Sequence, residues 1–295
     1  MPGYRHGAII APAGPVKPEV VNNGAAFLES RGLRVSVMPH VQDGAPEKYF
    51  SASLEQRVDD LHRAWRDPEI DLIVCARGGF GSMQLLPYLD WNLLRSRAVP
   101  VLGLSDITAL HLGMLKNGAG IPVSSVMLSG MMKAGEFTLR SLRFALGAEE
   151  GTFELPAQLL KDGRDFTALP RALNLSVAAA MCGTPYMPDL SGSFLVLEDL
   201  NEPPYRIERG LMQLQMCGVL AQCAGLAFGQ FTGCGTTDEM ELIYRKYAAY
   251  VDGPVWTGFP FGHESGIAAL NWNVPVTCRG GGLAVLQAQP GLLRA

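Results

Sequence analysis

Short apolar runs alternate with helical segments through the first half of this 295-residue chain. The run DLIVCA at residues 71–76 is almost continuously apolar, which is typical of a strand covered on both faces. Segments with helical periodicity follow such runs, and over residues 53–66 Val58, Leu61 and Trp65 share one face. Repeated alternation of this kind predicts a parallel sheet flanked by helices. The site of such a sheet lies at the carboxyl ends of its strands.

The chain is long for a single hydrophobic core, so we predict two domains. The periodic pattern of apolar residues is lost over residues 148–170, where glycine and proline recur. We therefore expect a parallel, helix-flanked α/β domain at residues 1–147 and a linker at 148–170. Short β segments among fewer helices predict a second, smaller, β-rich and barrel-like α+β domain at residues 171–295.

Charge and hydropathy exclude several kinds of partner. A formal net charge of −4 argues against nucleic acid, which needs a basic surface. No stretch approaches the ~18 apolar residues of a membrane span. The apolar run near the N-terminus is short and broken by proline, unlike a signal peptide, so we expect a cytoplasmic location. The cysteines show no CxxC and no paired ligand spacing, which predicts buried free thiols, no metal site and no cofactor.

The stretch VPVLGLSDITALHLGML at residues 99–115 places a hydroxyl where a strand gives way directly to a helix. The apolar run stops at Ser105, and Ile107, Leu110 and Met114 then lie on one helical face. Serine hydrolases hold their nucleophile at such a turn, because the helix N-terminus supplies free N–H groups. A serine before a helix is also a routine N-cap, and one residue can serve in both ways.

A glycine-rich turn, Arg77-Gly78-Gly79-Phe80-Gly81-Ser82, follows the apolar run DLIVCA and precedes a helical segment. It lacks the Gly-Lys-Ser/Thr ending of a phosphate-binding loop, and Gln84 stands where a dinucleotide-binding motif needs its third glycine. Closely spaced glycines still allow a backbone to approach another group closely. Both an oxyanion donor and a purely structural turn remain open for this segment.

A serine nucleophile needs a base, and the chain offers five candidates: His6, His40, His62, His111 and His263. His111 follows Ser105 by six residues on the same predicted helix, so its side chain points well away from the turn. His62 lies within an amphipathic helix. His263 differs because it lies in a glycine-bounded loop, GFPFGHESG, where functional imidazoles are often held.

The third group should be a carboxylate that orients the base. The segment SFLVLEDLNEPPYRIERGL presents Glu198, Asp199 and Glu202 at the end of an apolar strand. An acid at the end of a buried strand is costly unless it is paired. Strand parity does not choose between Glu198 and Asp199, and an ordinary helix-capping role stays open. Arg206 and Arg209 nearby can pair with these acids or receive a substrate carboxylate.

Together these segments resemble the LD-carboxypeptidase family of serine peptidases. The likeness rests on ARGGFGSMQLLPYLD, GLSDITALH, LVLEDLNEPPYRIERGLMQL and the FGH that ends at His263, in this order along nearly the whole chain. It implies that Ser105 is the nucleophile, Glu198 the orienting acid and His263 the base. It also implies an α/β N-terminal domain and a smaller β-rich C-terminal domain, usually paired as a homodimer.

The same resemblance implies acyl transfer to water at the amide bond before the terminal D-Ala of a murein stem peptide. The amides of Asp106 and of Gly78-Gly79 then match the oxyanion region. A carboxypeptidase must also bind a free carboxylate, for which Arg77 and Arg206 are candidates alongside the nearby Arg209. We expect a small peptide substrate in peptidoglycan recycling.

Two other functions are weighed beside this one. A relative of the microcin C immunity peptidases would cleave a peptide–nucleotide conjugate, and a two-domain binding protein would hold a small ligand without chemistry. The family often opens its second domain with Gly-Gly-Asn-Leu, where this chain has Ala172-Leu173-Asn174-Leu175. Val126-Met127 likewise replaces a frequent Gly-Pro. Both departures fall outside the three matched catalytic positions.

Overall fold

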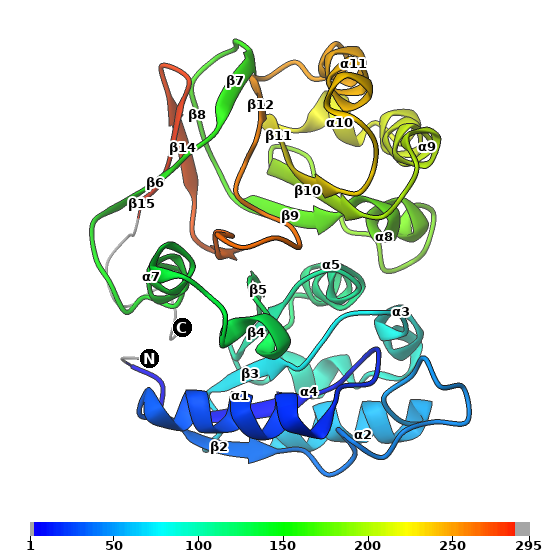
Figure 1. Cartoon of the computed structure of the whole chain (residues 1–295), viewed down its shortest axis with the longest axis vertical. Helices are drawn as coiled ribbons and strands as arrows, with labels where there is room; N and C mark the ends of the chain where they lie inside the picture. The colour runs from blue at the N-terminus through cyan, green and yellow to red at the C-terminus, as the bar shows by residue number, and fades with distance from the viewer. Residues whose placement is uncertain (1–2, 287–295) are drawn as a thin grey trace.

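The computed structural model describes residues 3–286. Figure 1 shows two lobes, with the blue-to-cyan first half of the chain in one and the later green-to-red part mostly in the other. The lower lobe contains a parallel sheet between helices, and the upper lobe is richer in strands. The predicted fold class, a helix-flanked parallel α/β part followed by a β-rich part, is therefore confirmed.

The sheet of the first lobe has the strand order β13-β5-β4-β3-β1-β2. Its five parallel strands are β1 (His6–Ile10), β2 (Arg34–Val37), β3 (Leu72–Cys75), β4 (Pro100–Gly103) and β5 (Ile121–Ser124). Four of the five are buried along their whole length, as the continuous apolar runs predict. An antiparallel edge strand, β13 (Leu270–Asn271), comes from far along the chain.

Helices cover both faces of this sheet (Figure 1). They are α1 (Pro18–Ser30), α2 (Leu54–Arg66), α3 (Ser82–Leu85) with the 3₁₀ turn Leu86–Tyr88, α4 (Trp91–Arg95), α5 (Ile107–Asn117), α6 (Leu128–Met131) and α7 (Glu136–Ala145). Local sequence explains their ends. Ser53 and Gln56 form a capping box before α2, and Gly118 ends α5 in the left-handed region at φ 61°.

The segment expected as a linker contains three strands: β6 (Thr152–Leu155), β7 (Gln158–Lys161) and β8 (Phe166–Ala168). Each pairs with a strand more than 90 residues further along the chain. These strands are short, and a local sequence pattern does not reveal pairing with a distant strand. The segment therefore lacks a recognisable secondary-structure pattern in the sequence. The division of the chain into domains stays a prediction.

The second lobe holds two sheets. Its larger sheet has the order β7-β12-β11-β10-β9, with β9 (Pro170–Asn174), β10 (Phe194–Leu200), β11 (Gly225–Thr232) and β12 (Val255–Thr257) parallel to one another. Its helices are α8 (Leu175–Met181), α9 (Pro204–Met216), α10 (Val219–Gln222) and α11 (Thr237–Ala248). A smaller antiparallel sheet, β6-β15-β14-β8, adds β14 (Val276–Arg279) and β15 (Gly282–Leu286).

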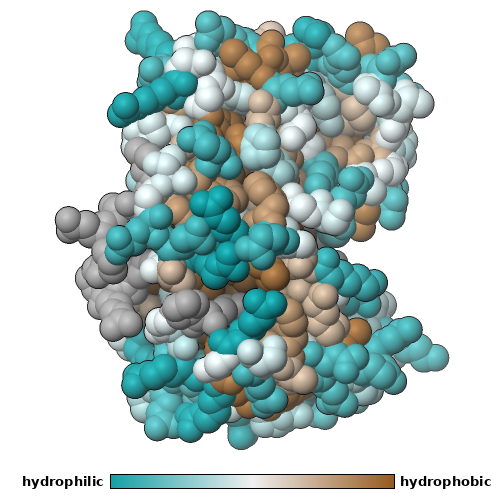
Figure 2. Space-filling model, turned by 60° about the vertical axis from the view of Figure 1, so that its left-hand side comes forward, coloured by the Kyte–Doolittle hydropathy of each residue, from teal (hydrophilic) through white to brown (hydrophobic). Residues whose placement is uncertain are grey.

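The two lobes are joined by more than the connecting chain. Trp272 follows β13 and is fully buried, and its indole N–H donates to Ser124 Oγ over 2.9 Å. Ser124 Oγ in turn donates to the carbonyl of Ala172 in β9 at 2.8 Å. Figure 2 shows the junction from another side, with hydrophobic side chains among hydrophilic ones along the centre of this face. The first lobe is therefore anchored directly to the larger sheet of the second.

Between residues 3 and 286, no helix combines the length and apolar character needed to cross a membrane.

Candidate active site

Ser105 lies in a strained turn between β4 and α5. Its φ is 63°, and among the described residues only Asn201 is another non-glycine residue with positive φ. A side chain in this region costs about 1–2 kcal/mol, so the turn is held by its surroundings rather than by local preference. The N-cap of α5 is Asp106, and Ser105 Oγ makes no hydrogen bond within residues 3–286. The alternative role of Ser105 as the N-cap of its helix is therefore not observed.

The glycine-rich turn after β3 lies directly against this serine. A Cβ placed on Gly78 would lie 2.9 Å from Ser105 Cβ and 3.2 Å from Ser105 Oγ, so only glycine allows this approach. The turn is fixed from the other side, because Gly14 N–H donates to the carbonyl of Gly78 at 3.0 Å. Gly79 has φ 113°, a conformation that L side chains rarely adopt. The glycines thus allow the backbone of the turn to lie close to the Ser105 side chain.

Backbone donors surround Ser105. Within the part of the chain that the structure describes, the amide N–H groups of Gly79 and Asp106 make no hydrogen bond. The Asp106 carboxylate is engaged elsewhere, since it accepts from Ser82 N at 2.8 Å, while Ser82 Oγ donates to the Asp106 carbonyl. This pair ties the start of α3 to the start of α5. Free amides next to a hydroxyl are the donors that an oxyanion needs.

Glu198 is fully buried near the end of β10 and meets the ring of His263. Its Oε2 lies 2.8 Å from His263 Nδ1, and its Oε1 accepts from Asn174 Nδ2 at 3.2 Å. Asp199 turns to α8 instead, where it accepts from Ser176 N at 3.0 Å and from Ser176 Oγ at 2.7 Å. The two adjacent acids, which strand parity left undecided, thus share Asn174 Nδ2 but otherwise have different partners.

A bulge in β11 positions the loop that carries His263. The pairing of β10 with β11 shifts register beyond Leu197, and Gln230 N–H then donates to the carbonyl of Phe261 at 2.8 Å. The Gln230 side chain accepts from Glu264 N at 2.8 Å, so one residue holds the loop on both sides of His263. Because the loop follows β12, which is separated from β10 by β11, His263 reaches the carboxyl end of β10 across the end of β11.

Charge and burial act in opposite directions on the two paired groups. Burial lowers the pKa of His263, but the hydrogen bond and charge of Glu198, with the charge of Asp199, raise that pKa above 6.5 overall. Burial raises the pKa of Glu198 above its usual range, against the hydrogen bonds from His263 and Asn174. His263 is therefore a stronger base than an exposed histidine.

Some of the expected site residues are not brought into contact. Within residues 3–286 no hydrogen bond joins Ser105 Oγ to the ring of His263. Arg77 donates to the carbonyl of Pro15 at 3.1 Å. Arg206 pairs with Glu202 on the surface at 3.2 Å, and Arg209 lies over the ring of Tyr205. In the described chain, none of these arginines forms a hydrogen bond or ion pair with the serine, the acid or the histidine.

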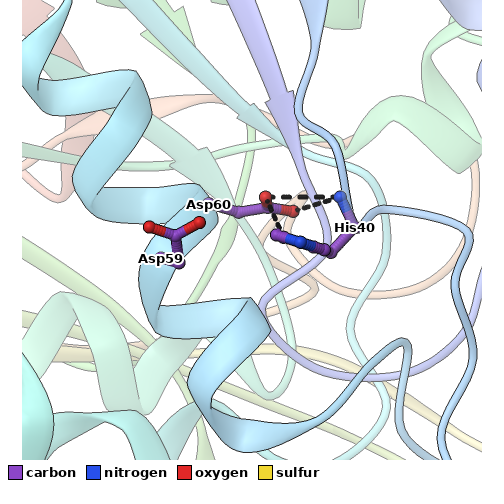
Figure 3. A group of neighbouring side chains, drawn as sticks. All are labelled: His40, Asp59 and Asp60. Atoms are coloured by element: carbon purple, nitrogen blue, oxygen red, sulfur yellow. Dashed lines mark hydrogen bonds and ion pairs between the residues drawn. The ribbon is translucent and has the colours of Figure 1, made fainter.

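The other histidines have structural partners. His6 bonds Ser36 Oγ, His62 accepts from Asp90 N, and His111 is buried against the carbonyl of Val101, where burial lowers its pKa to about 4. His40 forms a second histidine–carboxylate pair, with Asp60 at 2.8 Å. Figure 3 shows Asp59 beside this pair, with interactions drawn only between His40 and Asp60; Asp59 forms an ion pair with Arg63. Among the described residues, only His40, Asp59 and Asp60 group their potential metal-ligand atoms within 4.8 Å.

Asn174 is the residue that sequence reasoning missed. It begins α8 as the N-cap and accepts from Val177 N, while its Nδ2 donates to Glu198 and to Asp199, the latter at 3.0 Å. Its own N–H donates to Thr108 Oγ1 of α5 at 2.9 Å. The sequence signal was present, because asparagine before a short apolar helix is typical of an N-cap. Its contact with two acids depends on β9 and β10 being neighbours.

Comparison with known proteins places this geometry in a family. The protein-family model for the LD-carboxypeptidase N-terminal domain matches residues 8–124. The family model for the LD-carboxypeptidase C-terminal domain matches residues 173–278. Together the two matches cover well over half of the chain. The protein is thus a peptidase-type hydrolase by class, and it belongs to the LD-carboxypeptidase family.

Individual relatives agree with this assignment. The murein tetrapeptide carboxypeptidase of Pseudomonas aeruginosa is 34% identical over 87% of this chain and 87% of its own length. The probable murein peptide carboxypeptidase of Bacillus subtilis is 32% identical over 87% of this chain and 83% of its own.

Solved structures agree at the level of the fold. The muramoyltetrapeptide carboxypeptidase from Oxalobacter formigenes has a TM-score of 0.84 and 28% identity, over 96% of this chain and 99% of that one. The microcin C7 self-immunity protein bound to glutamyl sulfamoyl guanosine has a TM-score of 0.84 over 98% of this chain and 97% of its own, but only 17% identity. That second likeness concerns the fold alone.

Proposed function

We propose that this protein is a serine-type LD-carboxypeptidase that removes the terminal D-Ala from murein tetrapeptides through Ser105, His263 and Glu198. The observation that carries the proposal is the buried Glu198–His263 hydrogen bond of 2.8 Å, in a chain that also holds Ser105 in a strained turn between strand and helix. Burying a carboxylate costs free energy. A catalytic role explains this cost, because the carboxylate orients the imidazole and stabilises it once the ring has accepted a proton.

The proposed mechanism starts with Ser105. Its Oγ attacks the carbonyl carbon before D-Ala while His263 Nε2 takes the hydroxyl proton, because Nδ1 is engaged by Glu198. Negative charge then develops on the carbonyl oxygen, and the free amides of Gly79 and Asp106 are the donors proposed to receive it. Collapse of this intermediate breaks the C–N bond, and His263 gives its proton to the departing amine of D-Ala.

The second half of the reaction returns the enzyme to its starting state. A water molecule, deprotonated by His263, attacks the ester formed on Ser105. The C–O bond to Ser105 then breaks, and the serine recovers its proton from the imidazolium. Glu198 stays ionised throughout and stabilises the positive ring in each half-reaction. Closure of the Ser105–His263 hydrogen bond on substrate is part of the proposal, since catalytic hydrogen bonds often tighten only in the complex.

The substrate is inferred from the named relatives. Two curated relatives with more than 30% identity bear names that state murein peptides as their substrates. A terminal D-Ala carries a free carboxylate, for which Arg77 and Arg206 are the proposed partners. By the same family likeness we propose that the chain acts in the cytoplasm, in peptidoglycan recycling, and as a homodimer. Sedimentation of the purified chain tests the homodimer.

Release of free alanine from defined peptides tests this function. The purified chain is given a murein tetrapeptide ending in D-Ala, the same peptide ending in L-Ala, and an aminoacyl sulfamoyl adenylate. We expect hydrolysis of the D-Ala peptide and little of the L-Ala peptide. Preference for the sulfamoyl adenylate would instead support an immunity-type peptidase. Binding of the tetrapeptide without any release of alanine would support a binding protein.

A further inference from the structure

Two cysteines end neighbouring helices of the second lobe. Cys182 is the C-cap of α8 and Cys217 is the C-cap of α9. The two helices pack against each other, as Figure 1 shows at one side of the upper lobe. They run in the same direction because each follows one of the adjacent parallel strands β9 and β10. Two residues that are 35 positions apart in the chain are thereby placed at the same end of one helix pair.

The two thiols share a pocket. A cavity of about 190 Å³ is lined by both cysteines, together with Met187, Pro188 and Val219 among others. The Cys182 thiol donates to the carbonyl of Ala178 at 3.6 Å, and the nearby Cys217 sulfur contributes to the raised pKa of Cys182. Gln213 Nε2 donates to Cys217 Sγ at 3.6 Å. The two cysteines thus line the same cavity, at the ends of two helices that pack against each other.

The two members of the pair differ in access. Cys217 is exposed, so the prediction that the cysteines are buried is wrong for this residue, whereas Cys182 is half-buried. Burial, and then the Cys217 sulfur, raise the pKa of Cys182 to about 12, so this thiol stays protonated at neutral pH. The remaining cysteines of the chain are free and buried: Cys75, Cys223, Cys234 and Cys278. An oxidant therefore meets Cys217 first.

We propose that Cys182 and Cys217 form a redox-sensitive dithiol that a peroxide converts to a disulfide joining the ends of α8 and α9. The Cys217 thiolate attacks one peroxide oxygen, which breaks the O–O bond, gives a sulfenic acid and releases water after protonation. Cys182, once deprotonated, then attacks the Cys217 sulfur and expels the hydroxyl as a second water molecule. The two thiols lose two electrons in total, and hydrogen peroxide is reduced to two waters.

The position of the pair separates this chemistry from the proposed peptidase site. Glu198 lies at the carboxyl end of β10. Helices α8 and α9 run back along the sheet, so their own carboxyl ends lie near the amino ends of the strands. In the described chain, neither cysteine forms a hydrogen bond with Ser105, Glu198 or His263. The disulfide therefore constrains two helices of the second lobe, and the proposal does not depend on the peptidase function.

Peptide mapping after oxidation of the full-length protein tests the pair. Trypsin releases residues 172–206 with Cys182 as the single cysteine, and residues 210–245 with Cys217, Cys223 and Cys234. After treatment with hydrogen peroxide under native conditions, we expect these peptides to be disulfide-linked until a reductant is added. The Cys217→Ser variant should lose the link, while Cys223→Ser, which alters a buried thiol, should keep it.

A second variant keeps the test decisive. In Cys182→Ala the sulfenic acid at Cys217 has no resolving thiol, so we expect dimedone to capture it and no linked peptide to form. A link that persists in Cys217→Ser would assign it to Cys223 or Cys234 and overturn the proposal. Dimedone capture at Cys217 that is equally strong in the wild-type chain, with Cys182 still reduced, would overturn it as well.

Discussion

At residue 105 the backbone takes a conformation that serine does not favour. Ser105 has φ 63° in the turn between β4 and α5, and within residues 3–286 the adjacent amide of Asp106 makes no hydrogen bond. An ordinary N-cap serine needs neither feature, because it caps a helix from the extended region. The strain at Ser105 is therefore best explained by the reaction that we propose for its hydroxyl.

Gly78→Ala tests whether the glycine turn sets the place of Ser105. The new methyl group would lie 2.9 Å from Ser105 Cβ and 3.3 Å from the carbonyl of Leu104, so the serine or the turn must move. We expect the rate of D-Ala release to fall by about 10²-fold or more, since small displacements of a reacting group cost this much. Gly135→Ala is the matched control, because nothing lies within 4 Å of a Cβ there. Equal rates in both variants would contradict the close-approach argument.

Glu198→Gln tests the pairing of acid and base through pH. In the wild-type chain His263 must be neutral to act, so kcat/KM should fall as the pH drops through its pKa, which lies above 6.5. The variant removes the charge of Glu198, which raises this pKa more than that of Asp199 does, and leaves the burial that lowers it. We expect the acid limb of the profile to move to lower pH and the plateau to fall by about 10²–10⁴-fold. An unmoved acid limb would contradict the assigned roles.

The sequence predicts these residues unequally. Ser105 and His263 are recognisable because a strand–serine–helix turn and a glycine-bounded loop are local features. The choice between Glu198 and Asp199 is not local, since it depends on Asn174 and Ser176 lying on the neighbouring β9–α8 unit. Only the family resemblance selected Glu198 from the sequence, and the hydrogen bond to His263 agrees with that choice.

Among the elements, the bulged end of β11 links the acid to the base. Gln230→Ala would leave the bulge but remove the acceptor for Glu264 N, so the loop of His263 would lose one of its two attachments to residue 230. A single hydrogen bond contributes about 1 kcal/mol, so we expect kcat to fall roughly 5-fold with little change in KM. Steady-state kinetics check this. A variant whose only defect is a higher KM would place Gln230 in substrate binding instead.

Elements with strong periodicity are predicted well from the sequence, and the others are not. The apolar strands and the amphipathic helix with its capping box at Ser53 lie within a few residues of their expected places. The strands β6, β7, β8 and β13 were missed. Each is five residues or shorter and is defined by a partner more than 90 residues away, as when Leu270 pairs with Ser124. Pairing across such a distance leaves no local pattern.

For the whole molecule, the contacts between the lobes predict cooperative unfolding. Trp272→Phe removes the indole N–H that bonds Ser124 Oγ, a group which also holds Ala172 of β9. We expect the free energy of unfolding to fall by about 1–3 kcal/mol, because a buried hydrogen-bonding partner is lost. Urea unfolding followed by far-UV circular dichroism measures this. Two separate transitions in the wild-type chain would show that the lobes unfold independently.

The central claim is that Ser105 is the nucleophile of a D-Ala-releasing peptidase. The most direct measurement is the rate of D-Ala release from a murein tetrapeptide by the wild-type chain and by Ser105→Ala, with circular dichroism confirming the fold of each. The substitution keeps Cβ and therefore the demands of the positive φ, and it removes only the hydroxyl. We expect the variant to lose at least about 10³-fold in rate. Turnover by Ser105→Ala within about 10-fold of the wild-type rate would contradict the account.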